Sequence, residues 1–298
     1  MMITNIEECQ TIDTANDVTL DKLHFVLLEM IDEVDRLCRK HRISYFLDSG
    51  SALGAIRHGG FIPWDDDADI GMMRKEYNKF IKIAQKELNK KYVLQINDID
   101  PGYQLFHAKI VKLNTFYPQK GIFGYKYQGI MLDIFPFDYI PDEPRKAEKA
   151  IKHVRNAERL YYVSQQSLKQ RKGIKIMGAF LLKIFPPNFY RMRFERACIK
   201  YNKNRTNHVT CYTYWMSKVQ QLIFDAEDMT ISSDIQFENR KYMIMNNPDH
   251  YLKIMYGDYM EFPPESKRQC HLNGEIIFDL KKNENLIEEQ KNEKSINS

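Results

Sequence analysis

The sequence predicts an α+β fold in which a mixed β-sheet core is followed by a helical, basic addition. Apolar residues recur at helical spacing between residues 19 and 40, which predicts a long amphipathic helix. Short apolar runs bounded by turn residues follow, as expected for strands, and from residue 142 to about 205 the pattern is helical again. With 298 residues, of which 43% are hydrophobic, the chain can bury a sizeable core as one large domain or two small ones.

Each element can be placed from its local pattern. Helices are expected at residues 19–40, 52–57, 75–89 and 247–256, and strands at residues 43–47, 68–72, 92–96, 103–113 and 129–135. Pro248 suits the first turn of the last helix because its φ angle is fixed near the helical value. Asp138 lies beyond Pro136, outside the expected strand, and is interpreted as a helix or turn cap.

The composition divides the chain into five parts. They are an N-terminal extension (1–18), the core (19–140), a helical basic segment (141–225), a C-terminal segment that completes the site (226–280) and a tail (281–298). The tail is charged and poor in apolar residues, so we expect it to be disordered.

Four aspartates occupy five positions within the segment Tyr45–Arg74. They are Asp65, Asp66, Asp67 and Asp69. So much like charge is unfavourable unless a cation or solvent relieves it. Because Ile70 and Met72 extend the run, a strand here would place Asp67 and Asp69 on one face and the apolar groups on the other. Two parallel carboxylates favour a hard cation that prefers oxygen ligands, such as Mg²⁺, with Mn²⁺ as a substitute.

Two other interpretations of these aspartates are open. Counted from Asp65, acidic residues occupy positions 1, 3, 5 and 12 of an EF-hand calcium loop. Position 6, however, is Ile70 instead of the glycine that the sharp turn requires, and Pro63 interrupts the helix that should enter the loop. The remaining interpretation is a solvated acidic turn, which does not explain why the aspartates run directly into apolar residues.

Gly50 and Ser51 follow the apolar run Ile43–Leu47, at the point where a strand should end. A small pair in this position lets backbone N–H groups approach a phosphate closely. A phosphate-binding turn followed by a metal-binding strand is an arrangement suited to phosphoryl transfer.

These residues resemble the LicD family, whose members transfer phosphocholine or related phospho-alcohols from CDP-linked donors to glycans. The resemblance covers several separated motifs in one order. They are residues 44–48, 53–58, 60–69, Met131–Pro136, Tyr256–Met260 with Pro263 and Pro264, and Lys267–His271. The family often has Gly-Gly-Thr where this chain has Ser49-Gly50-Ser51, which is closer to the Gly-Ser pair of nucleotidyltransferases. Residues 141–225 match no motif of the family.

The resemblance implies a nucleotidyltransferase-like core in which a neighbouring strand supplies a third acidic residue. Asp133 is the candidate because it lies within an apolar run, where a buried carboxylate requires a metal or a specific partner. An ion pair with Lys109 or Arg57 is the alternative. On this reading Asp67, Asp69 and Asp133 bind the metal and are the catalytic residues. Asp133 would also accept the proton of the attacking hydroxyl.

Cationic side chains are expected around the phosphates, since phosphoryl transfer needs positive charge on the phosphate oxygens and on the departing CMP. The candidates are Arg57, His58, Lys109, Arg268 and His271. Lys109 interrupts an apolar strand and points either to solvent or into the cleft. Arg268 and His271 rest mainly on the family resemblance.

Aromatic residues would hold the quaternary ammonium of choline by cation–π contacts, because this group cannot donate a hydrogen bond. Trp64 is placed near the site by its position beside the aspartates, and Tyr212, Tyr214 and Trp215 form a second aromatic group. Most of the many other aromatic side chains are expected simply to pack in the core.

The resemblance implies transfer of phosphocholine, or a related phospho-alcohol, from CDP-choline or another CDP-alcohol. The acceptor would be a hydroxyl of a glycan or a lipid-linked saccharide, and CMP would be released. One alternative is a nucleotidyltransferase that uses the same carboxylates, and another is a non-catalytic, membrane-associated scaffold. No nucleic-acid partner is expected, and the sequence does not identify the alcohol or the acceptor sugar.

The segment Pro141–Arg205 carries 17 lysine and arginine residues against 5 acidic ones, although the net charge of the whole chain is only +4. Such polarity suggests that this segment faces something anionic. Within it, the apolar run Ile174–Phe185 has basic flanks and could lie in a membrane interface as an amphipathic helix. A buried helix is the alternative.

Five scattered cysteines, without paired spacing, favour a reducing compartment and argue against a zinc site. The first residues lack the features of a signal peptide, and no apolar run approaches the roughly 20 residues of a membrane span. We therefore expect a cytoplasmic protein, with peripheral contact at the inner face of the membrane.

Overall fold

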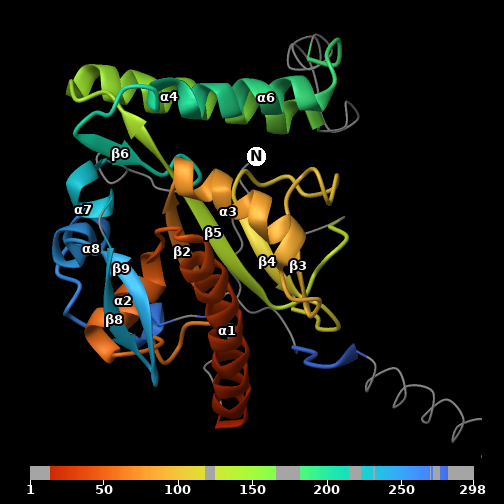
Figure 1. The fold of residues 1–298 in the computed structure, drawn as a ribbon, viewed down its shortest axis with the longest axis vertical. Helices are drawn as coiled ribbons and strands as arrows, with labels where there is room; N and C mark the ends of the chain where they lie inside the picture. The colour runs from red at the N-terminus through yellow and green to blue at the C-terminus, as the bar shows by residue number, and fades with distance from the viewer. Residues whose placement is uncertain are drawn as a thin grey trace, which may run out of the picture.

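The computed structural model in Figure 1 describes the chain over several stretches. They are residues 14–117, 125–165, 182–214, 223–230, 232–268, 270 and 276–280. Within them, helices pack around a mixed sheet, which confirms the predicted α+β fold class. No helix in these stretches is both long enough and apolar enough to cross a bilayer.

A 28-residue helix, α1 (Thr14–His41), lies along one side of the core (Figure 1). It begins earlier than the expected residue 19 and ends at nearly the expected position. The apolar residues that recur at helical spacing are buried, among them Leu23, Leu27, Ile31 and Val34. This stripe packs toward the sheet, so the predicted amphipathic helix is confirmed.

The central sheet has the strand order β1-β2-β5-β4-β3. Its strands are β1 (Phe46–Leu47), β2 (Asp69–Met73), β3 (Tyr92–Gln95), β4 (Ala108–Lys112) and β5 (Met131–Ile140). Strands β2 and β5 are parallel, whereas the other neighbours along this path are antiparallel. Helix α2 (Ser49–His58) connects β1 to β2, and α3 (Arg74–Glu87) follows β2 directly.

Strand β5 changes its antiparallel partner halfway along its length. Its pairing with β4 ends at Ile134, and its pairing with β6 (His208–Thr210) begins at Asp138. Pro136 lies between the two ladders, where a residue without a backbone N–H is tolerated. The predicted strand at 129–135 is therefore shorter than β5, because the proline marks the change of partner strand and not the end of the strand.

The interpretation of Asp138 as a turn or helix cap is wrong. Asp138 lies inside β5, is fully buried, and pairs across the ladder with Thr210. Its carboxylate accepts two hydrogen bonds from Arg74, at 2.8 and 2.7 Å, and a third from the side-chain amide of Asn202 at 2.6 Å. A buried carboxylate needs such partners, and here they join the start of α3 to the sheet.

The expected helical stretch 142–205 contains α4 (Pro144–Gln165), α6 (Pro187–Cys198) and a 3-10 turn, Ile199–Tyr201. Helices α4 and α6 pack side by side beyond one end of the sheet (Figure 1). Most of the apolar run 174–185 lies outside the described residues.

The C-terminal part adds elements that the sequence patterns did not predict, apart from the last helix. They are β7 (Phe224–Asp225), α7 (Ala226–Thr230), and a hairpin of β8 (Ser232–Phe237) and β9 (Arg240–Met245). Helix α8 (Pro248–Tyr256) is confirmed, with Pro248 in its first turn and Asn247 as its N-cap. The hairpin packs beside β1 and α2, and α8 packs on α2. A short 3-10 turn, Glu265–Lys267, follows.

Three boundaries differ from expectation in ways that affect the site. Strand β1 is only Phe46–Leu47, and α2 begins at Ser49 rather than at residue 52. Gly50 and Ser51 therefore lie in the first turn of a helix. The expected strand 103–113 is reduced to β4, while the strand at 92–96 and the helix at 75–89 are confirmed within two residues.

Candidate active site

The structure brings Asp69 and Asp133 together on adjacent parallel strands. Asp69 begins β2, and its register partner in β5 is Asp133. Residues in register on neighbouring strands point to the same face of a sheet. The backbone N–H of Asp133 also donates to the carbonyl of Ala68 at 3.0 Å, so the contact between the two chains extends one residue before β2. Asp67 lies two residues before the start of β2, close enough for its charge to act on Asp69.

Asp133 lies between two basic side chains of the β4 region. The ammonium nitrogen of Lys109 is 2.9 Å from Oδ1 of Asp133, and Nε2 of His107 is 3.5 Å from the same oxygen. Burial alone would raise the pKa of Asp133, but the charges of Lys109 and His107 outweigh it and hold the pKa well below its ordinary value. The ion pair with Lys109 that was considered as an alternative for Asp133 is therefore present.

Two buried atoms in this group lack a hydrogen bond of acceptable geometry. They are Oδ1 of Asp133 and Nε2 of His107. Oδ1 of Asp133 already has Lys109 as an ion-pair partner at 2.9 Å, so a cation bound here would share this oxygen with the lysine. The carboxylate oxygen is the type of donor that a divalent cation requires, so the residues present fit a metal.

Asp69 lies at the centre of the negative charge. Burial raises its pKa well above the ordinary value, and the carboxylates of Asp67, Asp133, Asp48 and Asp65 raise it further. A carboxylate in this position is destabilised in its ionised form unless a cation lies close to it. Asp67 and Asp69 are both half-buried, which leaves a route for a ligand.

Gly50 and Ser51 lie in the first turn of α2, directly above β2. The hydroxyl oxygen of Ser51 accepts a hydrogen bond from the backbone N–H of Asp69 at 2.9 Å, which fixes the helix to the start of β2. A Cβ on Gly50 would lie 2.6 Å from Oδ2 of Asp65. The helix N-terminus is thus close enough to this acidic loop for the absence of a side chain at Gly50 to matter.

Asp48, which the sequence reasoning missed, holds this turn in place. It is fully buried as the N-cap of α2, and its carboxylate accepts hydrogen bonds from the hydroxyls of Tyr214 and Tyr251, both at 2.5 Å. It also accepts one from the backbone N–H of Ser49 at 2.9 Å. Burial raises the pKa of Asp48 to about 6, although the three hydrogen bonds oppose the rise. Tyr214 therefore positions the helix N-terminus through Asp48.

A second group, which we call the arginine–aromatic cluster, consists of Arg57, His58, Trp64, Phe262 and Arg268. The guanidinium of Arg268 lies 5.0 Å from the ring centre of Trp64, and that of Arg57 lies 4.9 Å from the ring centre of Phe262. His58 packs edge-on against both rings. Four of the sequence-predicted residues are therefore brought together.

The charge of the arginine–aromatic cluster is not balanced within the described part of the chain. Burial lowers the pKa of Arg57, and the neighbouring Arg268 lowers it further. Burial and the charge of Arg57 likewise lower the pKa of His58. Both guanidinium groups donate to backbone carbonyls, and neither forms an ion pair with a described carboxylate. Two adjacent cations without acidic partners are suited to bind an anion.

The guanidinium groups already occupy positions over the rings of Trp64 and Phe262. A choline ammonium would have to compete with them, so proximity of Trp64 to the site does not make it a choline cage. Tyr212 and Tyr214 are buried in the core. Trp215 and His271 lie outside the described residues, and nothing is concluded about either.

His107 is the other residue that the sequence reasoning missed. It is buried, two positions before Lys109, and its ring packs against Phe135 with a centre distance of 4.5 Å. His107 could have been predicted from its spacing of two from Lys109, because residues two apart in a strand lie on the same face. The expectation that Lys109 points either to solvent or into the cleft is resolved: it is buried against Asp133.

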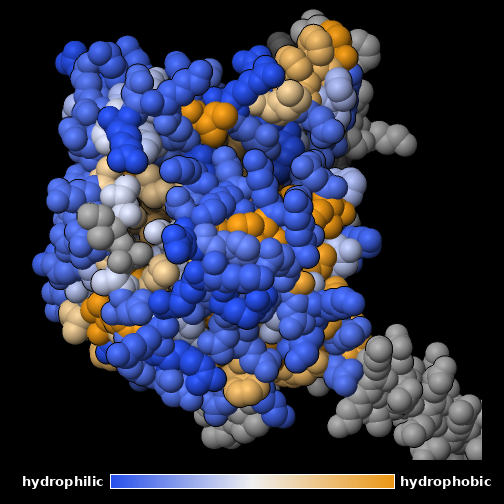
Figure 2. Space-filling model, viewed as in Figure 1, coloured by the Kyte–Doolittle hydropathy of each residue, from blue (hydrophilic) through white to orange (hydrophobic). Residues whose placement is uncertain are grey.

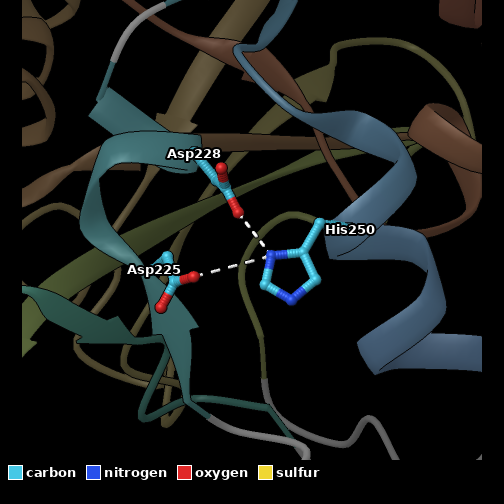
Figure 3. Close-up of side chains that lie close together, drawn as sticks. All are labelled: Asp225, Asp228 and His250. Atoms are coloured by element: carbon cyan, nitrogen blue, oxygen red, sulfur yellow. Dashed lines mark hydrogen bonds and ion pairs between the residues drawn. The ribbon is translucent and has the colours of Figure 1, made fainter.

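A separate set of ligand-type side chains lies away from these motifs, on β7, α7 and α8 (Figure 3). Nδ1 of His250 is 2.6 Å from a carboxylate oxygen of Asp228 and 3.6 Å from one of Asp225. All three side chains offer ligand atoms within 4.8 Å of one another. The two ion pairs are sufficient to explain this geometry, and Asp225 is half-exposed, so we do not assign a metal to it.

The comparisons with known proteins agree with this geometry. Residues 42–154 match the family model described as LicD/FKTN/FKRP, nucleotidyltransferase domain. The chain is similar to lipopolysaccharide cholinephosphotransferase LicD of Haemophilus influenzae, with 30% identity over 258 residues, which is 85% of this chain and 96% of that protein. Human ribitol 5-phosphate transferase FKRP is 57% identical over 30 residues, 10% of this chain and 6% of the relative.

An uncharacterised protein of Rickettsia typhi is 30% identical over 119 residues, which is 40% of this chain and 36% of that protein. The similarity to the Haemophilus protein covers more of the sequence, since it spans 85% of this chain and 96% of that protein. The predicted resemblance is therefore confirmed, and the chain belongs to the LicD family of phosphotransferases.

Proposed function

We propose that this protein transfers phosphocholine from CDP-choline to a hydroxyl of a lipopolysaccharide or another lipid-linked saccharide, and releases CMP. The observation that carries the proposal is the similarity over nearly the whole chain to a lipopolysaccharide cholinephosphotransferase. The register of Asp69 with Asp133, beside the N-terminus of α2, supports it from the chemistry of the site.

Asp67, Asp69 and Asp133 would hold Mg²⁺, or Mn²⁺ in its place. When bound, the ion supplies positive charge to the diphosphate of the donor. The raised pKa of Asp69, which lies among other carboxylates, supports a cation here. Lys109 keeps Asp133 ionised, which suits a metal ligand, whereas the lowered pKa of Asp133 makes it a weak base for the attacking hydroxyl.

The phosphate groups would be bound by two sets of donors. The backbone N–H groups of Gly50 and Ser51 form one set, at the positive end of the α2 dipole. Arg57 and Arg268 form the other, since neither has an acidic partner in the described part of the chain. Attack on the phosphorus distal to the cytidine leaves CMP as the departing group.

A panel of CDP-alcohols tests the proposal. Purified protein with Mg²⁺ is incubated with CDP-choline, CDP-ethanolamine, CDP-glycerol and CDP-ribitol, and nucleotide products are separated by chromatography. CMP released fastest from CDP-choline supports the proposal. CMP released only from another donor would change the alcohol, and release of pyrophosphate from a nucleoside triphosphate would favour a nucleotidyltransferase instead.

The same assay distinguishes an enzyme from a scaffold. Asp69→Asn is the matched control, because it keeps the shape of the side chain and removes one carboxylate charge. A metal-dependent CMP release that Asp69→Asn abolishes supports catalysis at the carboxylates. Absence of turnover with every donor and acceptor would favour the non-catalytic scaffold.

Peripheral membrane contact through the start of α6 would place the protein near a lipid-linked acceptor. Ile184, Phe185, Phe189 and Met192 are exposed, and Figure 2 shows apolar colour gathered at the upper right, where α6 begins. The surrounding segment is strongly basic, which suits the anionic surface of a membrane.

A further inference from the structure

A cavity of about 800 Å³ lies at the far end of the sheet from the carboxylates. It is bounded by the ends of β2 and β5, the start of α3, the 3-10 turn after α6, and α7. The carboxylate Asp133 and the cavity residue Tyr139 are six positions apart on β5, about 20 Å at 3.3 Å per residue. The cavity is therefore separate from the candidate active site.

The charge of this cavity is strongly positive. Six cationic side chains line it, and Glu76 is the one acidic side chain among the lining residues that the structure describes. The cations are Arg74, Lys75, Arg196, Lys200, Lys203 and Arg205. Arg74 is held by Asp138, whereas the other five form no ion pair with a described carboxylate. Cations gathered around a concave surface without acidic partners raise the local concentration of anions.

The backbone adds to this charge. Helix α3 begins at Arg74, and its N-cap residue, Met73, has no side chain that could accept a hydrogen bond from the first N–H groups. Both residues line the cavity. The positive end of a 14-residue helix therefore points toward the same space as the cationic side chains.

The floor of the cavity is apolar and partly aromatic. Phe46, Phe137 and Met229 are buried in it, and Tyr139 is half-buried. Tyr139 is the aromatic lining residue that keeps part of its surface exposed, so its side chain can contact a ligand in the cavity. A volume of this size lies within the range of small-molecule sites, which is about 300–1,000 Å³.

We propose that this cavity binds a phosphorylated organic molecule of nucleotide size, with its phosphate on the cations and its ring on the apolar floor. An inorganic anion would use the cations but leave the floor in contact with water. The proposal does not depend on the identity of the transferred phospho-alcohol, since none of the proposed catalytic residues lines the cavity.

Isothermal titration calorimetry with CMP and with inorganic pyrophosphate, both in EDTA, tests the proposal. All titrations use an Arg57→Gln with Arg268→Gln background, so that EDTA removes metal-dependent binding and the two substitutions remove the arginines proposed to bind phosphate at the candidate active site. We expect Lys200→Gln with Lys203→Gln to weaken CMP binding at least tenfold, because two phosphate-binding cations are lost. The control Lys149→Gln with Lys241→Gln removes the same charge from exposed positions outside the cavity and should leave binding unchanged.

A second variant separates the organic part of the ligand from its phosphate. Tyr139→Leu should weaken CMP binding at least fivefold and leave pyrophosphate binding unchanged. Equal binding of both probes by Tyr139→Leu and wild type would overturn the organic-ligand assignment. CMP binding that survives in the double lysine variant would overturn the site itself.

Activity and folding complete the test. CMP release from a CDP-alcohol, measured without CMP added, should be within twofold of wild type in the double lysine variant. A thermal midpoint within about 2 °C of wild type shows that this variant is folded. Loss of CMP release with intact folding would instead place these lysines in the active site and contradict a separate cavity.

Discussion

At the residue scale, the site depends on carboxylates whose environments make them different from one another. Asp133 lies beside Lys109 and His107 and is held in its ionised form. Asp69 is surrounded by other carboxylates, and its pKa is raised. Asp48 accepts hydrogen bonds from two tyrosines and serves as a helix cap. These three aspartates have the same side chain but different roles, because the charges and hydrogen-bond donors around each carboxylate differ.

Asp69→Asn should lower Mg²⁺ affinity and CMP release by orders of magnitude, because one metal ligand loses its charge. Its pKa is raised in the folded protein, so its ionised form lowers stability above the unfolded-state pKa. The metal-free variant should therefore be at least as stable as wild type in urea. Asp98→Asn, in an exposed turn, is the control. Near-normal turnover by Asp69→Asn at modest Mg²⁺ would contradict the assignment.

Asp48→Asn should change how stability depends on pH. The folded-state pKa is raised from 3.8 to about 6, so the stability that protonated Asp48 contributes is present below about pH 4 and is lost as the pH rises through about 6. Relative to wild type, the variant should gain about 3 kcal/mol in free energy of unfolding between about pH 4 and pH 7. Urea titrations across this range measure the difference.

Tyr251→Phe gives an independent check on the same group. It removes one hydrogen bond that lowers the pKa of Asp48, so the loss of stability should move to higher pH. An identical pH profile for wild type and Asp48→Asn would show that Asp48 does not titrate in this range.

At the element scale, the fold joins pieces of helix and strand through a few buried polar contacts. The start of α3 is fixed to β5 by the Arg74–Asp138 pair, and α2 is fixed to β2 by Ser51. Strand β5 connects two ladders across Pro136, which brings β6 and the basic helices to the same sheet that carries Asp133. The active-site end and the cavity end are therefore parts of one strand.

Asp138→Asn should destabilise the protein by roughly 3–5 kcal/mol, because it leaves the Arg74 guanidinium without a counter-charge in a largely buried site. The comparison is Glu148→Gln, which breaks the exposed pair with Lys152 and should leave the free energy of unfolding nearly unchanged. Both are measured by urea unfolding at neutral pH. A cost below about 1 kcal/mol for Asp138→Asn would mean that the ion pair does not stabilise the junction.

At the scale of the whole molecule, positive charge is concentrated at the end of the protein formed by α4, α6 and the following turn. The carboxylates lie at the opposite end of β5. The two regions are thus separated along the sheet, so an acidic cluster and a basic surface can exist in one chain without neutralising each other.

The exposed start of α6 should bind vesicles of anionic lipid at low salt. Ile184→Ser with Phe185→Ser should reduce binding, measured by co-sedimentation, because shallow apolar insertion is lost. Phe25→Ser removes an equally exposed aromatic residue from α1 and is the control. Binding should weaken as salt shortens the Debye length below about 8 Å, since each nearby lysine or arginine contributes about 1 kcal/mol.

CMP release from a soluble donor should be unaffected by these serine substitutions, which separates membrane residence from chemistry. If the wild-type protein does not bind anionic vesicles at low salt, membrane contact through α6 is contradicted. The exposed apolar side chains would then belong to an acceptor-binding surface.

The sequence by itself determined the long first helix, most elements of the central sheet and the carboxylate motif, but not the C-terminal strands. Helical spacing specified α1, and alternation predicted that Asp67 and Asp69 share a face, because side-chain direction follows from local periodicity. The Gly50–Ser51 pair was also found from local pattern, whereas Asp133 was a candidate because the family resemblance implies a third acidic residue. Arg57, His58, Trp64 and Arg268 were found as separate residues and not as the cluster that they form.

Only the tertiary structure decided which distant residues meet. Asp48 accepts hydrogen bonds from Tyr214 and Tyr251, which are more than 160 positions away in the sequence. The burial of Asp138 depends on the pairing of β6 with β5. His107 became visible as a site residue only through its distance to Asp133. The local sequence pattern predicts which groups are buried. The partner of a buried polar group depends on packing between segments far apart in the chain, so no local pattern predicts it.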